Sequence, residues 1–181
     1  MVQLSQTSLP AWAYEPAVQE ADPSGRVHTL IVLARASSQE GADAVATRWE
    51  AQLAGCDVRR HDCGDAELAA AVVRAALGRA VVGHRLGVIG TAQDCLAVRA
   101  VALRAGMADD ELYFAALDAR ERTVWCAHCR ATTVTTAALD EVVGCAGCAR
   151  SLVVYAHVSR LRGHHLGFMA DAEDQPWSAA G

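Results

Sequence analysis

The stretch RLGVIGTAQDCLAVRAVALRAGMADDELYFAAL, residues 85–117, indicates the fold class of this chain. It opens with a short apolar run at 85–90, which is typical of a buried strand, and continues through Thr91 into a helix predicted over 92–104. A second apolar run at 111–117 predicts another strand. Strand, helix and strand joined by short links are typical of a parallel sheet with right-handed crossovers.

The residues before this stretch show the same alternation. Strands are predicted over 28–36 (HTLIVLARA) and 57–61, and a helix is predicted over 42–53, where apolar residues recur every three or four positions. Asp65 has the character of an N-cap for a further helix that runs to Leu77. The pattern therefore predicts an α/β domain with a small Rossmann-like parallel sheet over residues 26–119.

Residues 1–25 show neither the helical nor the strand period. Three prolines and a glycine are scattered among polar residues, so this segment is predicted to be an irregular N-terminal arm. Trp12 and Tyr14 are its aromatic residues, and we expect them to cover the edge of the chain's own core.

The composition excludes several classes of function. The chain has 181 residues, 52% of them hydrophobic and 20% charged, so it is predicted to form a globular core. All 16 basic residues are arginine, and lysine does not occur, which excludes Schiff-base catalysis by this chain and the phosphate loop that ends in lysine. The formal net charge of −5 argues against binding to nucleic acid.

No stretch of the sequence suits a membrane. The longest apolar run, near residues 68–90, is interrupted by arginine and histidine, and the first residues lack the basic and apolar regions of a signal peptide. Seven cysteines, four of them in two C-x-x-C pairs, do not suggest a disulfide framework. We therefore expect a cytoplasmic protein without a membrane partner.

A change in chemistry near Ala119 predicts a second domain. Residues 1–119 contain 10 arginines and 15 acids, whereas residues 120–181 contain six of each and four of the seven cysteines. The Val- and Thr-rich segments ATTVTT, DEVVG and SLVVYAHV in this second part are predicted strands. Residues 120–181 are therefore predicted to form a β-rich, rubredoxin-like zinc ribbon.

The strongest chemical signal is a C-x2-C-x15-C-x2-C spacing. Each C-x-x-C forms a tight knuckle that directs two thiolates at one ion, and two such knuckles complete a tetrahedron. Gly144 and Gly147 are expected to relieve the backbone of the second knuckle. The predicted metal ligands are Cys126, Cys129, Cys145 and Cys148.

The chemistry of four thiolates leaves the ion open between zinc and iron. Thiol-disulfide exchange is the competing interpretation, but a redox pair usually opens a helix, and one pair suffices. His128 lies within the first knuckle and is expected to be exposed rather than a fifth ligand. His157, His164 and His165 could bind a second metal, although a β-hairpin turning at Gly163 is the favoured interpretation.

No catalytic residues are predicted. Cys56, Cys63 and Cys95 have no spacing that suggests a site, so they are expected to be small buried hydrophobes. The turn at Gly90 and Thr91 could receive an anion at a helix N-terminus, but it lacks a glycine-rich motif and is interpreted as an ordinary strand-to-helix turn.

The runs VWCAHC (124–129), GCAGC (144–148), LVVYAHVSR (152–160) and LGFMADAE (166–173) resemble the C-terminal domain of the dimethylamine monooxygenase small subunit, the DmmA-like family. The resemblance implies a subunit of a heteromeric monooxygenase that demethylates a secondary amine with a reduced nicotinamide nucleotide and dioxygen. It further implies a haem oxygenase subunit and a flavin and iron-sulfur reductase subunit as partners, which would carry the haem, flavin and iron-sulfur centres. The four cysteines of the knuckles are the only residues of this chain that can be matched one by one to residues of the family.

This chain would then be an accessory subunit that acts as a metal-bearing scaffold or an electron-transfer element. Two other functions stay open at this point. One is a zinc-ribbon interaction or regulatory protein without a redox role, and the other is a nucleotide-dependent oxidoreductase that works alone through the Gly90 turn.

Overall fold

The computed structural model describes residues 7 and 9–172, which fall into two compact units. One unit comprises residues 10–119 and 160–163, and the other comprises residues 7, 9, 120–159 and 164–172. The described residues form two five-stranded sheets, and the predicted mixed α/β class is confirmed. In the part of the chain that the structure describes, no helix is long and apolar enough to cross a membrane.

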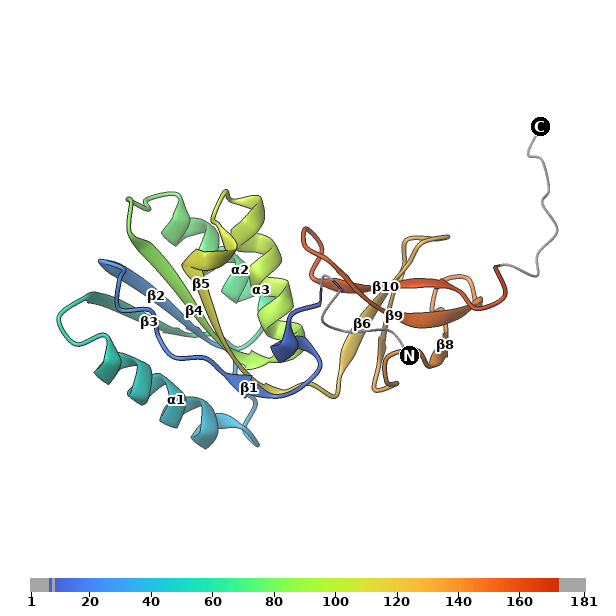
Figure 1. Ribbon diagram of the computed structural model, residues 1–181, viewed down its shortest axis with the longest axis horizontal. Coiled ribbons are helices and arrows are strands. Elements are labelled where there is room, and N and C mark those ends of the chain that lie inside the picture. The colour runs from blue at the N-terminus through green and yellow to red at the C-terminus, as the bar shows by residue number, and fades with distance from the viewer. Residues whose placement is uncertain (1–6, 8, 173–181) are drawn as a thin grey trace. The chain divides into compact units, whose positions relative to one another are not determined.

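The first sheet has the strand order β1-β5-β4-β2-β3. Four of its strands are parallel, and β1 pairs with β5 in the antiparallel direction (Figure 1). The sequence predicts each parallel strand because each contains a short apolar or alternating run. The bounds are β1 Ala17–Val18, β2 Val27–Val32, β3 Asp57–Asp62, β4 His84–Thr91 and β5 Leu112–Asp118.

Three helices connect the parallel strands, and they lie on both faces of the sheet (Figure 1). Helix α1 covers one face, and α2 and α3 pack together on the other. Under α1 lies a continuous apolar core that includes Leu30, Ile89 and the fully buried Trp49. Among the described residues, the helices are α1 Gln39–Gln52, α2 Ala66–Leu77 and α3 Ala92–Arg104, and the 3-10 turns are η2 Ala11–Ala13 and η3 Asp109–Glu111.

Residues 10–25 are more ordered than the irregular arm that the sequence predicts. They contain η2 and the two-residue strand β1, neither of which is long enough to show a period. Trp12 is buried and stacks on Phe114, with ring centroids 4.4 Å apart. The backbone N–H of Gln19 donates to the carbonyl of Phe114 at 2.9 Å, which extends the pairing beyond β1. This segment therefore covers the chain's own core, as expected of its aromatic residues.

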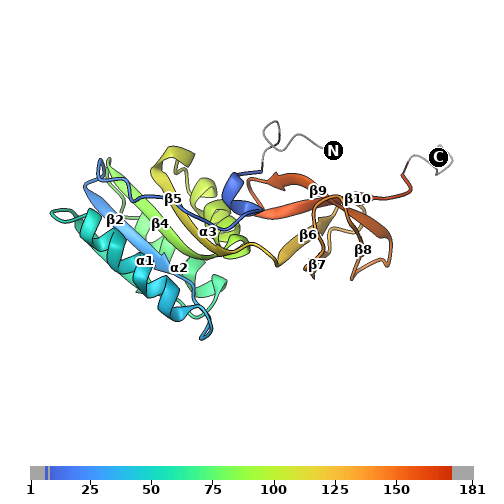
Figure 2. The same cartoon turned by 60° about the horizontal axis from the view of Figure 1, so that its bottom comes forward.

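The second sheet has the order β7-β6-β10-β9-β8 (Figure 2). Strands β6 and β10 are parallel, and the other pairs are antiparallel. The predicted hairpin is present, because β9 and β10 pair across a turn in which Gly163 adopts a φ of +69°. The bounds are β6 Arg122–Cys126, β7 Thr132–Thr135, β8 Val142–Gly144, β9 Ser151–Ser159 and β10 His164–Met169.

Candidate metal centre

The two C-x-x-C pairs come together at the ends of two strands. Strand β6 ends at Cys126, and β8 ends one residue before Cys145. The four sulfur atoms all lie within 4.8 Å of one another. The Sγ atoms of Cys126 and Cys148 are 3.9 Å apart, and those of Cys129 and Cys145 are 3.5 Å apart.

The two knuckles have the same backbone hydrogen bonds. In the first, the N–H of Cys126 donates to the carbonyl of Ala131, and the N–H of Arg130 donates back to Cys126, both at 2.9 Å. The equivalent bonds in the second knuckle join Cys145 to Arg150 and Ala149, again at 2.9 Å. Arg130 and Ala149 close the two turns in the left-handed region, with φ values of 66° and 58°. This repetition directs two sulfurs from each turn toward one centre.

Gly147 and Gly144 play different parts in the second knuckle. A Cβ on Gly147 would lie 2.6 Å from the Cβ of Ala131 and 3.0 Å from the sulfur of Cys129, so a side chain there would push the knuckles apart. Around Gly144 there is open space. Neither glycine has a positive φ, so the expectation that both relieve the backbone of the turn is wrong, and at Gly147 the constraint is the close approach of the knuckles.

The sulfurs lie against the small apolar core of this unit. Cys126 and Cys145 are buried, whereas Cys129 and Cys148 are half-buried. The buried members of the core besides these cysteines are Val124, Leu152 and Val154. The apolar core on one side of the cluster would shield a bound ion from water. On the other side, the half-buried Cys129 and Cys148 keep two sulfurs near the surface.

The thiols of this cluster differ in how easily they ionise. The backbone amides of Cys148 and Gly147 point at the sulfur of Cys145 and lower its pKa to about 6. The amide of Ala131 lowers the pKa of Cys129, but burial and hydrogen bonds with the other three thiols outweigh it and raise that pKa to about 12. A negative charge on one sulfur therefore suppresses ionisation of its neighbour, and a cation would relieve that repulsion.

The residues present fit a tetrahedral metal site. Zinc–sulfur bonds of about 2.3 Å place the sulfurs of a regular tetrahedron about 3.8 Å apart, close to the two distances given above. The sulfurs are too far apart for disulfides, in which they would be separated by about 2.05 Å. Neither knuckle is followed by a helix, which a redox pair of the thioredoxin kind would open.

The histidines considered in the sequence analysis do not add ligands to this cluster. His128 is exposed, as expected. His165 is buried, its Nδ1 lies 3.3 Å from the carbonyl of Tyr155, and burial lowers its pKa to about 4. Among the residues that the structure describes, the four cysteines of the knuckles are the one group with metal-ligand geometry, so the second metal site is not formed there.

The three remaining cysteines belong to the α/β unit. Cys63 and Cys95 are buried, and burial raises the pKa of each thiol. Cys56 is half-buried, and its thiol donates to the carbonyl of Gly25 at 3.5 Å. They are packed side chains of the core and its border, as predicted for the two buried ones.

In the strand-to-helix turn at Gly90, a carboxylate of the chain itself occupies the N-terminus of α3. The hydroxyl of Thr91 accepts a hydrogen bond from the N–H of Asp94, and the Asp94 carboxylate accepts hydrogen bonds from the N–H and hydroxyl of Thr91. A Cβ on Gly90 would lie 3.1 Å from the carbonyl oxygen of Leu33, so the turn is also crowded. Because a carboxylate fills the N-terminus of α3, the geometry supports the ordinary turn and not a phosphate site.

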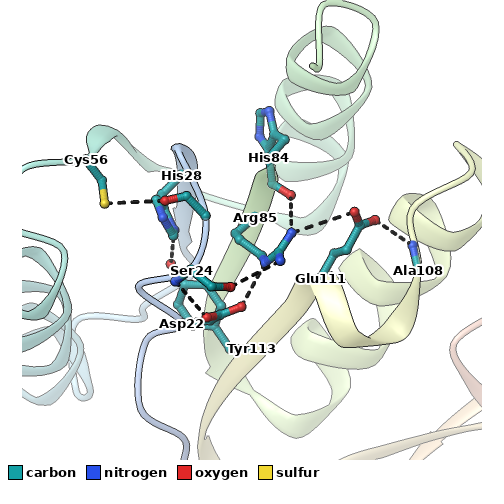
Figure 3. A network of polar contacts seen from close by, with 10 residues as sticks. Asp22, Ser24, His28, Cys56, His84, Arg85, Ala108, Glu111 and Tyr113 are labelled. Carbon is teal, nitrogen blue, oxygen red and sulfur yellow. Dashed lines mark hydrogen bonds and ion pairs between the residues drawn. The ribbon is translucent and has the colours of Figure 1, made fainter. Parts of the chain in front are cut away.

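The sequence analysis did not predict a network of polar side chains that lies at the amino ends of β2 and β4 (Figure 3). The guanidinium of Arg85 donates to Asp22 at 2.8 Å and to Ser24 at 3.2 Å, and it lies 3.7 Å from Glu111. Arg85 holds the pKa of Asp22 at about 2. These partners satisfy the charge of Arg85, so the network ties the segment before β2 to the sheet and is structural.

The fold and the cluster define a class: a mixed α/β protein with two sheets and a closed set of four cysteines that could hold a metal ion. Residues 123–168 match the family described as dimethylamine monooxygenase subunit DmmA-like, C-terminal domain. The chain is also 31% identical, over 158 residues, to the heme-dependent oxidative N-demethylase delta subunit of Ectopseudomonas mendocina (strain ymp). That match covers 86% of this chain and 85% of the relative.

The chain therefore belongs to the family of this delta subunit, and the predicted resemblance is confirmed. No solved structure matches the chain.

Proposed function

We propose that this chain is a non-haem accessory subunit of a heteromeric, haem-dependent amine monooxygenase of the dimethylamine type. The observation that supports this most directly is the pairing of family membership with a closed four-cysteine cluster. The α/β unit would be Rossmann-like, and residues 120–181 would form a rubredoxin-like zinc ribbon. Its partners would be a haem oxygenase subunit and a flavin and iron-sulfur reductase subunit, which together carry out oxidative N-demethylation in the cytoplasm.

In this proposal Cys126, Cys129, Cys145 and Cys148 hold one zinc or iron ion. Zinc would supply cross-linking of the two knuckles, and iron would supply one-electron redox chemistry. The amides of Gly147 and Cys148 help Cys145 to ionise, and Gly147 allows the two turns to approach. Four sulfurs leave no open position, so the site would bind no substrate.

The geometry supports a role as a structural scaffold more strongly than a role in electron transfer. The matching knuckles and the few buried apolar residues around them are typical of a structural site. The half-exposed sulfurs of Cys129 and Cys148 favour the second role, because an electron donor could approach that side. A zinc-ribbon interaction protein without a redox role is the alternative function.

Elemental analysis of the chain, purified anaerobically after co-expression with the proposed haem and reductase subunits and without added metal, tests the proposal. We expect one zinc or one iron per chain and co-purification with a haem-containing subunit. The Cys148→Ser variant should lose both the metal ion and the haem-containing subunit. The Cys56→Ser variant is the matched control, because Cys56 is half-buried but lies outside the cluster. A chain that carries less than a tenth of an equivalent of metal in an intact complex would disprove the metal role. A metal-loaded chain that purifies alone would favour the alternative.

A further inference from the structure

A cleft of about 360 Å³ lies in the α/β unit between α2 and the sheet. Its floor comes from β2, β3 and β4, its wall from α2, and its rim from the loop that follows α2. Cavities of this size are typical of small-molecule sites. The residues that line it are Val27, Thr29, Arg59, His61, Val72, Ala75, Ala76, Arg79, Val81 and His84.

The cleft exists because α2 presents short side chains to this part of the sheet. Val72, Ala75 and Ala76 form its wall, while the fully buried residues Ala69 and Val73 lie elsewhere on the helix. Helix α2 makes more contacts with α3 than with any strand. The helix therefore leaves the region above β3 uncovered.

The floor of the cleft is polar where a sheet face under a helix is usually apolar. Arg59 and His61 are alternate residues of β3, so their side chains share one face of the sheet. Thr29 and His84 are buried beside them, and the Thr29 hydroxyl and the Nε2 of His84 share a hydrogen bond of 3.0 Å. Four polar side chains from three strands thus converge on one apolar wall.

The cleft is lined by two guanidinium groups and two imidazoles, and no carboxylate of the described residues lines it. Arg59 pairs with Asp57 at 2.7 Å, but both side chains are about half-exposed, so this pair is weak and leaves donors of the guanidinium free. The side chain of Arg79 makes no hydrogen bond or ion pair with any residue that the structure describes. Burial lowers the pKa of His84, so at neutral pH it offers a hydrogen bond and not a charge.

We infer that this cleft binds a small organic anion with one carboxylate and a short apolar body. Arg59 and Arg79 would hold the carboxylate, since guanidinium groups match its two oxygens. Val72, Ala75 and Ala76 would contact the apolar body. Phosphate shares the preference for arginine, but a bare phosphate would leave the apolar wall uncovered. This site is separate from the cysteine cluster and does not rest on the function proposed above.

Titration of the full chain with hexanoate, followed by amide NMR shifts, tests the inference. We expect saturable shifts in β3, in α2 and around His84. Arg79→Ala should weaken hexanoate binding about tenfold, since it removes a charge-assisted hydrogen bond. Ala76→Leu should abolish binding, because the larger side chain fills the cleft. The matched controls are Arg74→Ala and Ala71→Leu on the exposed side of α2, which should bind as the parent does.

Hexanol and inorganic phosphate are the comparison ligands, and both should bind at least tenfold more weakly than hexanoate. Hexanol binding as tightly as hexanoate would overturn the anion assignment. Phosphate binding as tightly, with the same loss in Arg79→Ala, would overturn the carboxylate assignment. The site itself would be disproved if none of the three ligands gave saturable shifts, or if Ala76→Leu folded normally and bound hexanoate unchanged.

Discussion

The two sheets have the same number of strands but different means of stability. The α/β sheet buries a continuous apolar core in which Trp49, Leu30 and Ile89 are fully enclosed. Among the described residues, the second sheet buries five apolar side chains besides cysteine, namely Val124, Leu152, Val154, Ala156 and Val158, and three of these form the cluster around the cysteines. A unit of this size with so few buried side chains requires a further source of stability, and the cysteine cluster lies where that source would act. The comparison shows that one sheet rests on apolar burial, and we propose that metal–thiolate bonds supply what the smaller core of the other sheet lacks.

The largest effect is expected from Cys145→Ser. This change removes the ligand whose thiol ionises most readily of those described above, and structural zinc provides about 10 kcal/mol or more of the apparent folding free energy of small zinc modules. We expect loss of the metal and of amide protection across β6–β10, with protection in β2, β4 and β5 retained. Hydrogen exchange read by mass spectrometry measures both regions at once.

Cys63→Ser provides the control for this comparison, because it alters a thiol of the α/β unit. It should leave the metal content and the protection of β6–β10 unchanged. If Cys145→Ser kept one ion per chain and an unchanged melting curve, the contrast between the two sheets would be wrong.

Trp49→Ala is expected to have the next largest effect, on the other sheet. Trp49 is fully buried, packs edge-on against Tyr113 with centroids 4.7 Å apart, and donates from Nε1 to the carbonyl of Gln19 at 2.9 Å. Loss of the ring should reduce the free energy of unfolding of the α/β unit by about 3–5 kcal/mol. Denaturant unfolding followed by circular dichroism measures the loss.

Trp49→Phe keeps most of the ring volume and should cost clearly less than Trp49→Ala. Metal content should stay at the parental value in both variants. An equal loss of stability in β6–β10 would show that the two sheets unfold together and would remove the distinction between them.

The smallest effect is expected from Asp22→Asn. The hydrogen bond from Arg85 lowers the pKa of Asp22 to about 2, and the side chain is 36% exposed. Because solvent screens a partly exposed pair, we expect the variant to lose about 1 kcal/mol of stability at pH 7. Thermal unfolding of the α/β unit measures this difference.

The pH dependence of this pair follows from the lowered pKa. Asp22 ionises at a higher pH in the unfolded chain than in the folded one, so its contribution is complete above about pH 5. It should shrink as the pH falls through about 2, the pKa of Asp22 in the folded chain, and the parent and Asp22→Asn should become equally stable only below that value. Asp110→Asn, at an exposed carboxylate, is the control and should match the parent throughout. A constant difference from pH 7 to pH 2 would contradict the role of the Asp22 charge.

Local patterns in the sequence predicted most of the α/β unit. Helix α3 spans residues 92–104 as predicted, because Thr91 and Asp94 form a capping box at its start. Asp65 caps α2 by accepting a hydrogen bond from the N–H of Leu68 at 2.8 Å. Each of these caps joins residues three positions apart, so it can be recognised from a single sequence. Strand β1 was missed because two residues show no period, and it forms only by pairing with β5, about 100 residues away.

The same distinction applies to the sites. The cysteine cluster was predicted because the spacing within each knuckle is local and chemically specific. Strand β6 was missed because one of its three buried positions is Arg122, which interrupts the apolar alternation of the strand. The polar cleft was also missed, because Thr29, Arg59 and His84 meet only after three strands have paired. Its one signal in the sequence is the row of polar residues at alternate positions of β3, where a strand under a helix should be apolar.

The two edges of the α/β sheet also bear on self-association between copies of the chain. An open edge of a sheet offers unpaired N–H and carbonyl groups to strands of other molecules, and aggregation begins at such edges. Here β1 exposes an edge of only two residues, and β3 bears Asp57, Arg59 and Asp62 along the other. Strand β1 is too short to pair with a strand of another molecule, and the charges on β3 oppose such pairing. We therefore expect the α/β sheet not to aggregate through its edges, even at high protein concentration.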